Sequence, residues 1–302
     1  MGASINCLLE GGCVVGGIVA DGAKLQYIIG GHSLLLSGGE RFTLSGGSKS
    51  VFRQFYLTGK NEFAELARGI TVGCNYSMIV FDVDGTLLGG EQTDWACFGA
   101  AFAEAAGFEL TESFFATIKE VTAKAIVHEA LASRPQHEKA AMEQAVCEGY
   151  LRRLEAAHAK NPGCFPATEG AVNLMKALQF RGIPHAIATG DWHKSITFKL
   201  RAATIPHENL PLVTSSDYYS RAEIIAEAVV RAGGSLKDAV YVGDGLWDLR
   251  ACQALGITFI GIGHRREKLL AAGAQWVLND LHPQTVFSLL REMQKVTDRS
   301  PE

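Results

Sequence analysis

The chain has 302 residues, enough for one large core or for two domains. Its hydrophobic content of 47% and charged content of 20% are ordinary for a globular protein, and a net charge of -4 excludes the basic footprint of a nucleic-acid-binding protein. The seven cysteines are scattered and never spaced C-x-x-C, so we expect reduced thiols, no zinc site and a cytoplasmic protein. No apolar run reaches the roughly 18 residues that span a membrane.

Residues 1–77 hold nearly half of the 33 glycines. Gly-Gly pairs recur every eight positions at 30–31, 38–39 and 46–47, and the six residues between pairs have the length of a short strand. The segment is therefore either a small β-meander or a poorly ordered extension ahead of a natural start at Met78. The backbone entropy that glycine loses on ordering favours the second interpretation.

The segment from Met78 to Leu88 begins with a buried strand, predicted by its apolar and β-branched residues. The strand stops at two carboxylates, Asp82 and Asp84, which are followed by Gly85. A glycine here predicts that the backbone turns, so that the two carboxyl groups point in different directions and can do different jobs. A plain Asp-Gly turn is the alternative.

Residues 89–165 have helical apolar spacing with no strand pattern among them. The pattern predicts helices over 94–106, 112–131 and 136–160. Trp95 and Phe98 are expected in the core of this helical block, rather than at a binding site. We interpret the block as an insertion that follows the first strand.

Strands and helices alternate from residue 166 onward. This pattern predicts an α/β fold, in which a parallel sheet is covered by helices on both faces and binds ligands at the carboxyl ends of its strands. The predicted strands are 185–189, 212–214, 239–243, 257–262 and 276–278, and the predicted helices are 169–181, one beginning at 193, 222–232, 246–255, 267–272 and 283–295.

Reactive groups follow three of the predicted strands. Several acids at one edge of a sheet repel one another unless a cation lies among them, and oxygen ligands without histidine or cysteine favour magnesium. The hydroxyl of Thr189 and the free backbone N–H groups that follow it, ahead of the next helix, suit the binding of an oxyanion. Trp192 and His193 are further candidates to line the same cleft. The site candidates are Asp82, Asp84, Thr189, Gly190, Arg221, Asp244 and Asp248.

The chain from Met78 to Val296 resembles the haloacid dehalogenase-like superfamily, because four motifs occur in the order that this family has. The motifs are Asp82-Val83-Asp84-Gly85-Thr86, Thr189-Gly190, Arg221 and Gly243-Asp244-Gly245-Leu246-Trp247-Asp248. The helical block resembles the helical cap of phosphoglycolate phosphatase-like members. The resemblance implies a Rossmann-like core with a parallel sheet over 78–88 and 166–302, an inserted helical cap over 89–165, and a glycine-rich N-terminal extension over 1–77 that lies outside the family.

The resemblance also implies roles for these residues. Asp82 would be the nucleophile that carries an aspartyl-phosphate, and Asp84 would be the acid that protonates the leaving oxygen and then the base that activates water. Magnesium would be held by Asp82, by the backbone carbonyl of Asp84 and by Asp244, with Asp248 in direct or water-mediated support. The remaining candidates would bind phosphate, and these are Thr189, Gly190 and Arg221.

Arg221 departs from the family pattern, which usually has lysine at this motif. A guanidinium can bridge the phosphate and the nucleophile as a fork, whereas an ammonium is a point charge. A solvated arginine at a helix start is the alternative interpretation.

The expected activity is magnesium-dependent hydrolysis of a small-molecule phosphate monoester, by a monomer or homodimer without nucleic-acid or membrane partners. Asp84 argues against a dehalogenase, since a halide leaving group needs no proton. A sugar phosphomutase of the same superfamily shares all four motifs and stays open. A non-catalytic binding protein is the alternative from another class.

Overall fold

The computed structural model describes residues 78–297 and, ahead of them, five strands within residues 7–45. The chain divides into two units, Met1–Thr71 and Val72–Glu302, which are described separately. In the first unit the strands form an antiparallel sheet in chain order. The rest of residues 1–77 lies outside the described residues, including the six residues that follow the third Gly-Gly pair. The strands are β1 (Cys7–Leu8), β2 (Val14–Asp21), β3 (Lys24–Ile29), β4 (His32–Ser37) and β5 (Leu44–Ser45).

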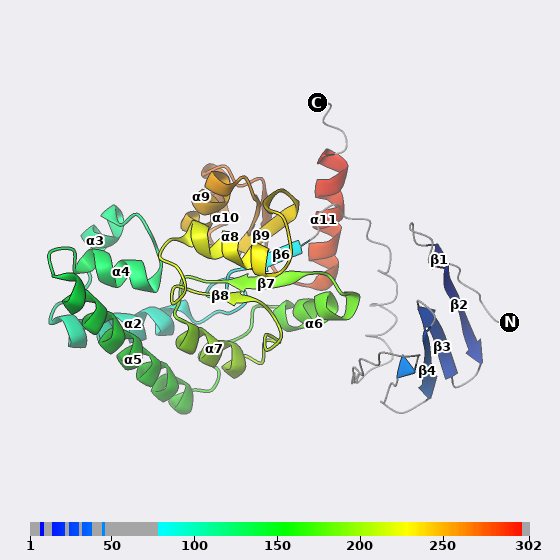
Figure 1. Ribbon diagram of the computed structural model, residues 1–302, viewed down its shortest axis with the longest axis horizontal. Helices are drawn as coiled ribbons and strands as arrows, with labels where there is room; N and C mark the ends of the chain where they lie inside the picture. Colours follow the sequence, from blue (N-terminus) through cyan, green and yellow to red (C-terminus); the bar gives the residue numbers. More distant parts are fainter. Residues whose placement is uncertain are drawn as a thin grey trace. The chain divides into compact units, whose positions relative to one another are not determined.

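The second unit is built on a six-stranded parallel sheet in the order β11-β10-β9-β6-β7-β8. Figure 1 labels strands β6 to β9 of this sheet. The strand that begins at Met78 is central, and its neighbours on either side are the second and third strands that carry candidate site residues at their ends. This arrangement confirms the predicted α/β fold class. The strands are β6 (Met78–Phe81), β7 (His185–Ala188), β8 (Leu212–Val213), β9 (Ala239–Gly243), β10 (Thr258–Ile262) and β11 (Trp276–Leu278).

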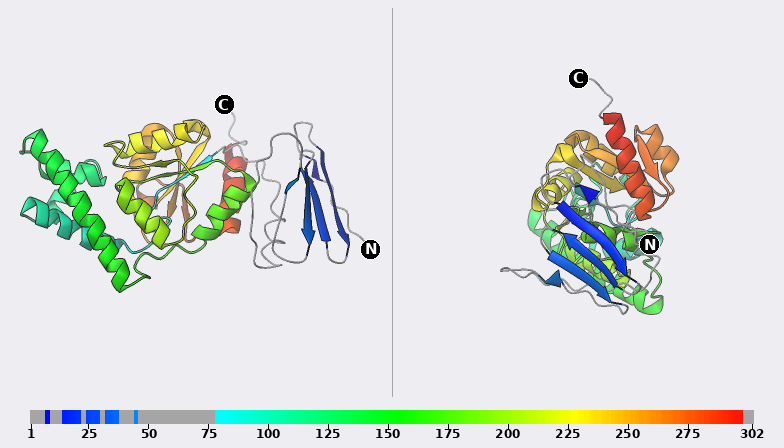
Figure 2. Two further views of the ribbon diagram at one scale, coloured as in Figure 1. Left: turned by 60° about the horizontal axis from the view of Figure 1, so that its bottom comes forward. Right: turned by 90° about the vertical axis from the view of Figure 1, so that its right-hand side faces the viewer.

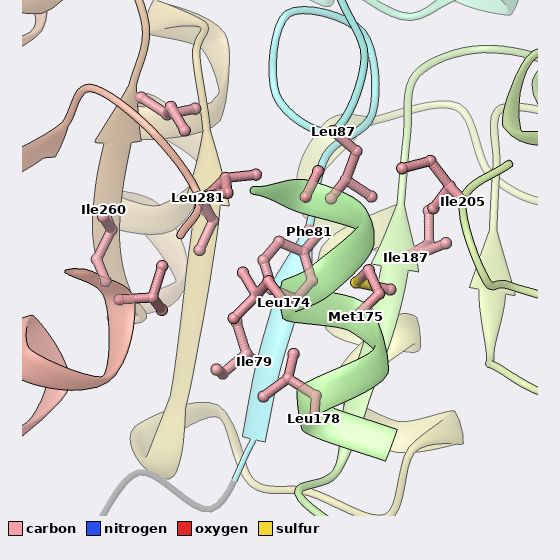
Figure 3. Close-up of a cluster of buried hydrophobic side chains, with 14 of the residues drawn as sticks. Ile79, Phe81, Leu87, Leu174, Met175, Leu178, Ile187, Ile205, Ile260 and Leu281 are labelled. Carbon is pink, nitrogen blue, oxygen red and sulfur yellow. The ribbon is translucent and has the colours of Figure 1, made fainter. Parts of the chain in front are cut away.

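Helices cover both faces of the sheet because alternate residues of each buried strand point to opposite sides. Ile79 and Phe81 of β6 pack with Leu174 of α6 (Ala171–Arg181) in one apolar cluster (Figure 3), whereas Val80 packs in the other. The first face is covered by α6, α7 (His193–Ala202) and α11 (Pro283–Thr297). The second is covered by α8 (Arg221–Arg231), α9 (Leu246–Leu255) and α10 (Arg266–Ala271), and a short 3-10 helix, Leu236–Asp238, precedes β9.

Four helices lie between β6 and α6 in the sequence, and we refer to residues 89–165 as the cap. They gather at one end of the unit, with α6 and α11 at the opposite end (Figures 1 and 2). The cap has its own apolar cluster, which includes Phe102, Val127 and Leu154. Among the described residues, no helix combines the length and apolar character needed to cross a bilayer. The cap helices are α2 (Glu91–Ala106), α3 (Glu112–Thr117), α4 (Ala123–Ala130) and α5 (Gln136–Lys160).

The helix predicted over 112–131 is wrong, because the chain is helical only in α3 and α4 and is interrupted between them. Thr122 explains the interruption. Its hydroxyl donates a hydrogen bond to the carbonyl oxygen of Tyr219 in the core (2.8 Å) and accepts one from the N–H of Ala125, which caps α4 (3.2 Å). The segment 118–122 therefore leaves the helix in order to contact the core.

Candidate active site

The chain turns sharply after β6, at Gly85. This glycine has a φ of 81°, and a Cβ atom on it would lie 2.5 Å from the carboxyl group of Asp244. The N–H of Gly85 donates to the carbonyl oxygen of Leu88 (2.7 Å), which closes the turn. A glycine is needed here for its positive φ and for the close approach of the loop after β9.

The structure brings the sequence-predicted site residues together at the carboxyl edge of the sheet. Asp248 lies behind the cleft, with a carboxylate oxygen within 4.8 Å of those of Asp82 and Asp244. The proposed roles of these residues stay predictions, but all seven meet in one place. The six that line the cleft are Asp82, Asp84, Thr189, Gly190, Arg221 and Asp244.

Arg221 is buried, with 6% of its surface exposed, so it is not a solvated residue at a helix start. Its Nη1 donates to Oδ1 of Asp82 (3.0 Å), and its Nε lies 3.4 Å from Oδ1 of Asp248. Its Nη2 donates to the carbonyl oxygen of Val121 in the cap (3.1 Å). Although burial favours the neutral form, the charges of Asp248 and Asp82 raise the pKa of Arg221 above its ordinary value. The guanidinium therefore links the two acids to the cap.

Three buried carboxylates form a set of hard oxygen donors suited to a divalent cation such as magnesium. Asp82 and Asp244 are each 3% exposed, and Asp248 is fully buried. Oδ1 of Asp244 has no hydrogen-bond partner, as expected of an oxygen reserved for a ligand. Asp248 is already held, since it accepts hydrogen bonds from the hydroxyl of Tyr241 (3.3 Å) and the N–H of Gly245 (3.1 Å). Asp248 therefore fits a supporting role better than a direct one.

Burial dominates the electrostatics of these acids. It raises the pKa of Asp82 well above the ordinary value, and the nearby charge of Asp248 adds to the effect. Burial, again with Asp248, raises the pKa of Asp244 to about 7. The pKa of Asp84 is also raised to about 7 by burial, although Lys199 opposes the shift. A cation bound among these acids would favour their ionised forms.

Sequence reasoning missed Lys199, which lies fully buried on α7 beside Asp84. Its Nζ lies among the carboxylates of Asp84, Asp94 and Asp191, so this second acidic cluster is paired with a protein cation. A signal was present in the sequence. Asp191, Ser195 and Lys199 recur at four-residue spacing, which places Ser195 and Lys199 on one face of α7 and Asp191 just ahead of that helix.

Among the aromatic residues near the cleft, Trp95 differs most from the sequence expectation. Trp95, predicted to be cap core, is instead 40% exposed and lines the cleft. Phe98 belongs to the cap cluster as predicted, and it also lines the cleft. Trp192 is buried in the cap cluster and stacks on Phe98 (5.8 Å between ring centroids), while His193 is exposed. In the described part of the chain, neither of these two is among the residues that line the cleft. Packing decides how each helix is turned about its own axis, and this in turn decides which side chains face the cleft.

Arg265, in the loop after β10, was also missed. Its Nη1 lies 3.1 Å from Oδ2 of Asp244, and its guanidinium lies 5.2 Å from the ring centroid of Trp247. Both Arg265 and Trp247 line the cleft. No sequence motif distinguished this arginine from the surface arginines around it.

Comparison with known proteins gives a consistent family and fold. A family model described as haloacid dehalogenase-like hydrolase matches residues 79–262. A phosphoglycolate phosphatase from Synechococcus elongatus is 24% identical over 223 residues, which cover 71% of this chain and 99% of the relative.

Two solved structures share the fold. A hydrolase from Pseudomonas syringae has a TM-score of 0.57 at 21% identity, over 72% of this chain and 99% of its own. A β-phosphoglucomutase from Clostridium difficile has a TM-score of 0.58 at 13% identity, over 73% of this chain and 99% of its own. At these identities the structural likeness shows a shared fold and nothing about activity.

Proposed function

Because the chain belongs to the haloacid dehalogenase-like hydrolase family, we propose that it hydrolyses small-molecule phosphate monoesters, with magnesium, through an aspartyl-phosphate intermediate. The observation that carries this proposal is the carboxylate of Asp82, held by Arg221 in a cleft that Asp84 and Asp244 also line. This arrangement supplies a nucleophile, a proton donor and compensating positive charge at one place.

In the proposed first step, an oxygen of Asp82 attacks phosphorus, and the bond between phosphorus and the alcohol oxygen breaks. Asp84 gives its proton to the departing oxygen. Because burial raises the pKa of Asp84 to about 7, a protonated carboxyl is available near neutral pH. In the second step, a water molecule loses a proton to Asp84 and attacks phosphorus, which releases phosphate and restores Asp82.

The other residues of the site would bind the phosphate group and the metal. The hydroxyl of Thr189, the N–H of Gly190 and the guanidinium of Arg221 would hold the phosphate oxygens. Asp82, the backbone carbonyl of Asp84 and Asp244 would hold magnesium, with Asp248 in support. When bound, the metal offsets negative charge on the transferring group.

The test is phosphate release from 4-nitrophenyl phosphate, with and without a chelator. Asp82→Asn should lower kcat by about 10⁴-fold or more, and the chelator should abolish turnover by the unchanged protein. Asp280→Asn, outside the cleft lining, is the matched control and should keep full activity. Full turnover by Asp82→Asn, or turnover insensitive to the chelator, would contradict the mechanism.

A sugar phosphomutase is the second candidate, favoured by the same four motifs. Such an enzyme would convert glucose 1-phosphate into glucose 6-phosphate, whereas a phosphatase would yield glucose and free phosphate. The ratio of these products distinguishes the two activities.

A further inference from the structure

The ammonium group of Lys199 lies near the cleft, in contact with three carboxylates and one hydroxyl. It donates to Oδ1 of Asp84 (2.7 Å) and Oδ1 of Asp94 (2.6 Å), and lies 2.9 Å from Oδ2 of Asp191. The hydroxyl oxygen of Tyr150 lies 3.2 Å away. Lys199 itself is completely buried, whereas all four partners line the cleft. The lysine therefore stands directly behind the cleft wall.

Stability alone is a poor explanation for this arrangement. Burying a lysine and several carboxylates costs desolvation free energy, and apolar residues of similar size often replace such clusters without loss of stability. The cluster also carries more carboxylates than cations. A group of this kind next to a reactive side chain points to a role in catalysis.

We propose that Lys199 is a positioning residue, which holds one oxygen of Asp84 so that the other faces the departing alcohol oxygen. This inference rests on the proposed function, in which Asp84 transfers the proton. A carboxyl that turns freely about its Cβ–Cγ bond would present the proton in the right direction only part of the time. One strong, charge-assisted bond to Oδ1 removes that freedom.

The lysine also joins the cap to the core. Asp84 and Asp191 follow core strands, whereas Asp94 lies on α2 and Tyr150 on α5 of the cap. Tyr150 donates a hydrogen bond to Asp94, so the two cap residues form one unit around the ammonium. Orientation of Asp84 is thereby coupled to the presence of the cap over the cleft.

The test compares two leaving groups. Nitrophenolate departs from 4-nitrophenyl phosphate with little need for a proton, whereas the alkoxide of benzyl phosphate needs one. Because kcat/KM reports the steps through departure of the alcohol, it isolates the first proton transfer. Lys199→Met should lower kcat/KM by about 100-fold for benzyl phosphate and by about 10-fold or less for 4-nitrophenyl phosphate. Lys199→Arg should restore part of the loss.

Three further variants complete the test. Lys194→Met changes an exposed lysine of the same helix and should alter neither substrate. Tyr150→Phe removes one hydroxyl and should give the same leaving-group pattern at smaller size, even if Lys199→Met does not fold. In an Asp84→Asn background, Lys199→Met should cause little further loss, since both changes act through one carboxyl.

Equal losses on the two substrates, or additive losses in the double variant, would overturn the positioning role. If the unchanged protein released phosphate from neither substrate, that result would instead contradict the proposed function.

A second inference comes from a different observation, the lining of the cleft by the cap. The cap contributes apolar groups, among them Trp95, Phe98 and Ile126, and two acids, Glu91 and Asp94. Trp95 packs edge to face on Phe98 (5.9 Å) and on Phe115 (5.5 Å), and so presents an aromatic surface. The lysines and arginines of the cap, all within the described residues, are not among those that line the cleft.

The cations of the cleft lining come from the core, and each is already paired. Arg221 holds Asp82, and Arg265 lies 3.1 Å from Asp244. A second phosphate or a carboxylate on the alcohol part of a substrate would meet apolar and acidic groups on the cap side. Such an anion would lose its hydration without gaining a counter-charge.

We infer that the substrates are phosphate monoesters whose alcohol part is uncharged and has an apolar, aromatic or alkyl, surface. This inference deepens the proposed function and rests on it. Phosphoglycolate, whose alcohol part carries a carboxylate, is expected to be a poor substrate despite the likeness to a phosphoglycolate phosphatase.

The test is kcat/KM for 2-phenylethyl phosphate, ethyl phosphate and phosphoglycolate. The aromatic ester should exceed phosphoglycolate by at least about 10-fold, and Trp95→Ala should raise KM about 10-fold for the aromatic ester but not for ethyl phosphate. Phe108→Ala, at an aromatic residue of the cap that is 44% exposed and outside the cleft lining, is the control.

A preference for phosphoglycolate, or equal effects of Trp95→Ala on both neutral esters, would overturn this inference and leave the phosphatase proposal intact. If none of the three esters were hydrolysed, that result would count against the phosphatase proposal itself.

Discussion

The core and the cap line the same cleft with different kinds of side chain. The core supplies charged groups at or near the ends of strands, such as Asp82, Arg221 and Asp244, whereas the cap supplies mainly apolar surface from helices, such as Trp95 and Phe98. Transfer of a phosphoryl group needs fixed charges, and selection of an alcohol needs a fitting surface. Under the proposed function, this difference assigns the reaction to the core and the choice of substrate to the cap.

If this division holds, changes at the core groups that bind the phosphoryl group or the metal should reduce turnover of every substrate alike, unlike a change at Lys199, whose effect depends on the leaving group. A large effect is expected at Gly85, in the turn after β6. Gly85→Ala would place a Cβ atom 2.5 Å from the carboxyl group of Asp244 at a φ of 81°. Since displacement of a site group by about 1 Å can cost 10²-fold, we expect kcat to fall about 100-fold for all esters.

Gly182→Ala separates collision from backbone strain. Gly182 has a φ of 64°, but nothing lies within 4 Å of the position a Cβ would occupy. This control should lose about 1 kcal/mol of unfolding free energy and keep its kcat. Equal losses of activity in the two variants would show that strain, rather than contact with Asp244, explains the effect.

Arg221→Lys tests how closely the core depends on a forked cation. The guanidinium contacts Asp82, Asp248 and Val121 from three different nitrogens, which one ammonium cannot reproduce. We expect kcat to fall about 10²-fold, with the ratio between aromatic and alkyl esters unchanged. Arg231→Lys, at the exposed end of the same helix, should have no effect. A changed substrate ratio would mean that this core residue also selects the alcohol.

Core and cap also differ in how far the sequence predicts them. Asp82, Thr189 and Asp244 could be placed because a short apolar run followed by a glycine or hydroxyl marks the end of a buried strand, and parallel strands end at one edge. Pairing of β6 with β7 and β9 then fixes the meeting point. The position of the core site follows from local pattern and topology alone.

The cap residues depend on information that local pattern lacks. Trp95 and Tyr150 both fit an apolar stripe, and only the packing of α2 against α5 shows that both of them line the cleft. The interruption at 118–122 is hidden because apolar spacing continues across it, while its cause is a contact with Tyr219 far along the chain. In the core, Lys199 on α7 was missed for another reason, since a lysine on a helix is usually solvated.

The buried charges of the core also predict a pH dependence of stability. In the metal-free protein, burial raises the pKa of Asp84 and of Asp244 to about 7, whereas the unfolded chain ionises these groups near pH 4. The folded protein then binds more protons than the unfolded chain between about pH 4 and 7. The free energy of unfolding should therefore fall as pH rises through this window.

Urea unfolding at pH 5, 6 and 7 in the presence of a chelator measures this slope. Asp244→Asn removes one of the carboxyl groups whose pKa is raised and should make the decline shallower, and magnesium should do the same because it favours the ionised form. The prediction would be contradicted if stability rose from pH 5 to pH 7. It would also be contradicted if Asp244→Asn left the slope unchanged, since Asp244 would then not contribute to the pH dependence.

The smallest expected effect concerns the contact through which the cap meets the core. Thr122 caps α4 and also donates to the carbonyl oxygen of Tyr219, whereas Thr111 caps α3 by accepting from the N–H of Phe114 (3.3 Å) and is exposed. Each Thr→Ala change should lower the free energy of unfolding by about 1 kcal/mol. Only Thr122→Ala should also raise KM, by a few fold, because the cap is then less firmly held over the cleft. An equal rise of KM in Thr111→Ala would mean that cap stability in general, rather than this one contact, governs binding.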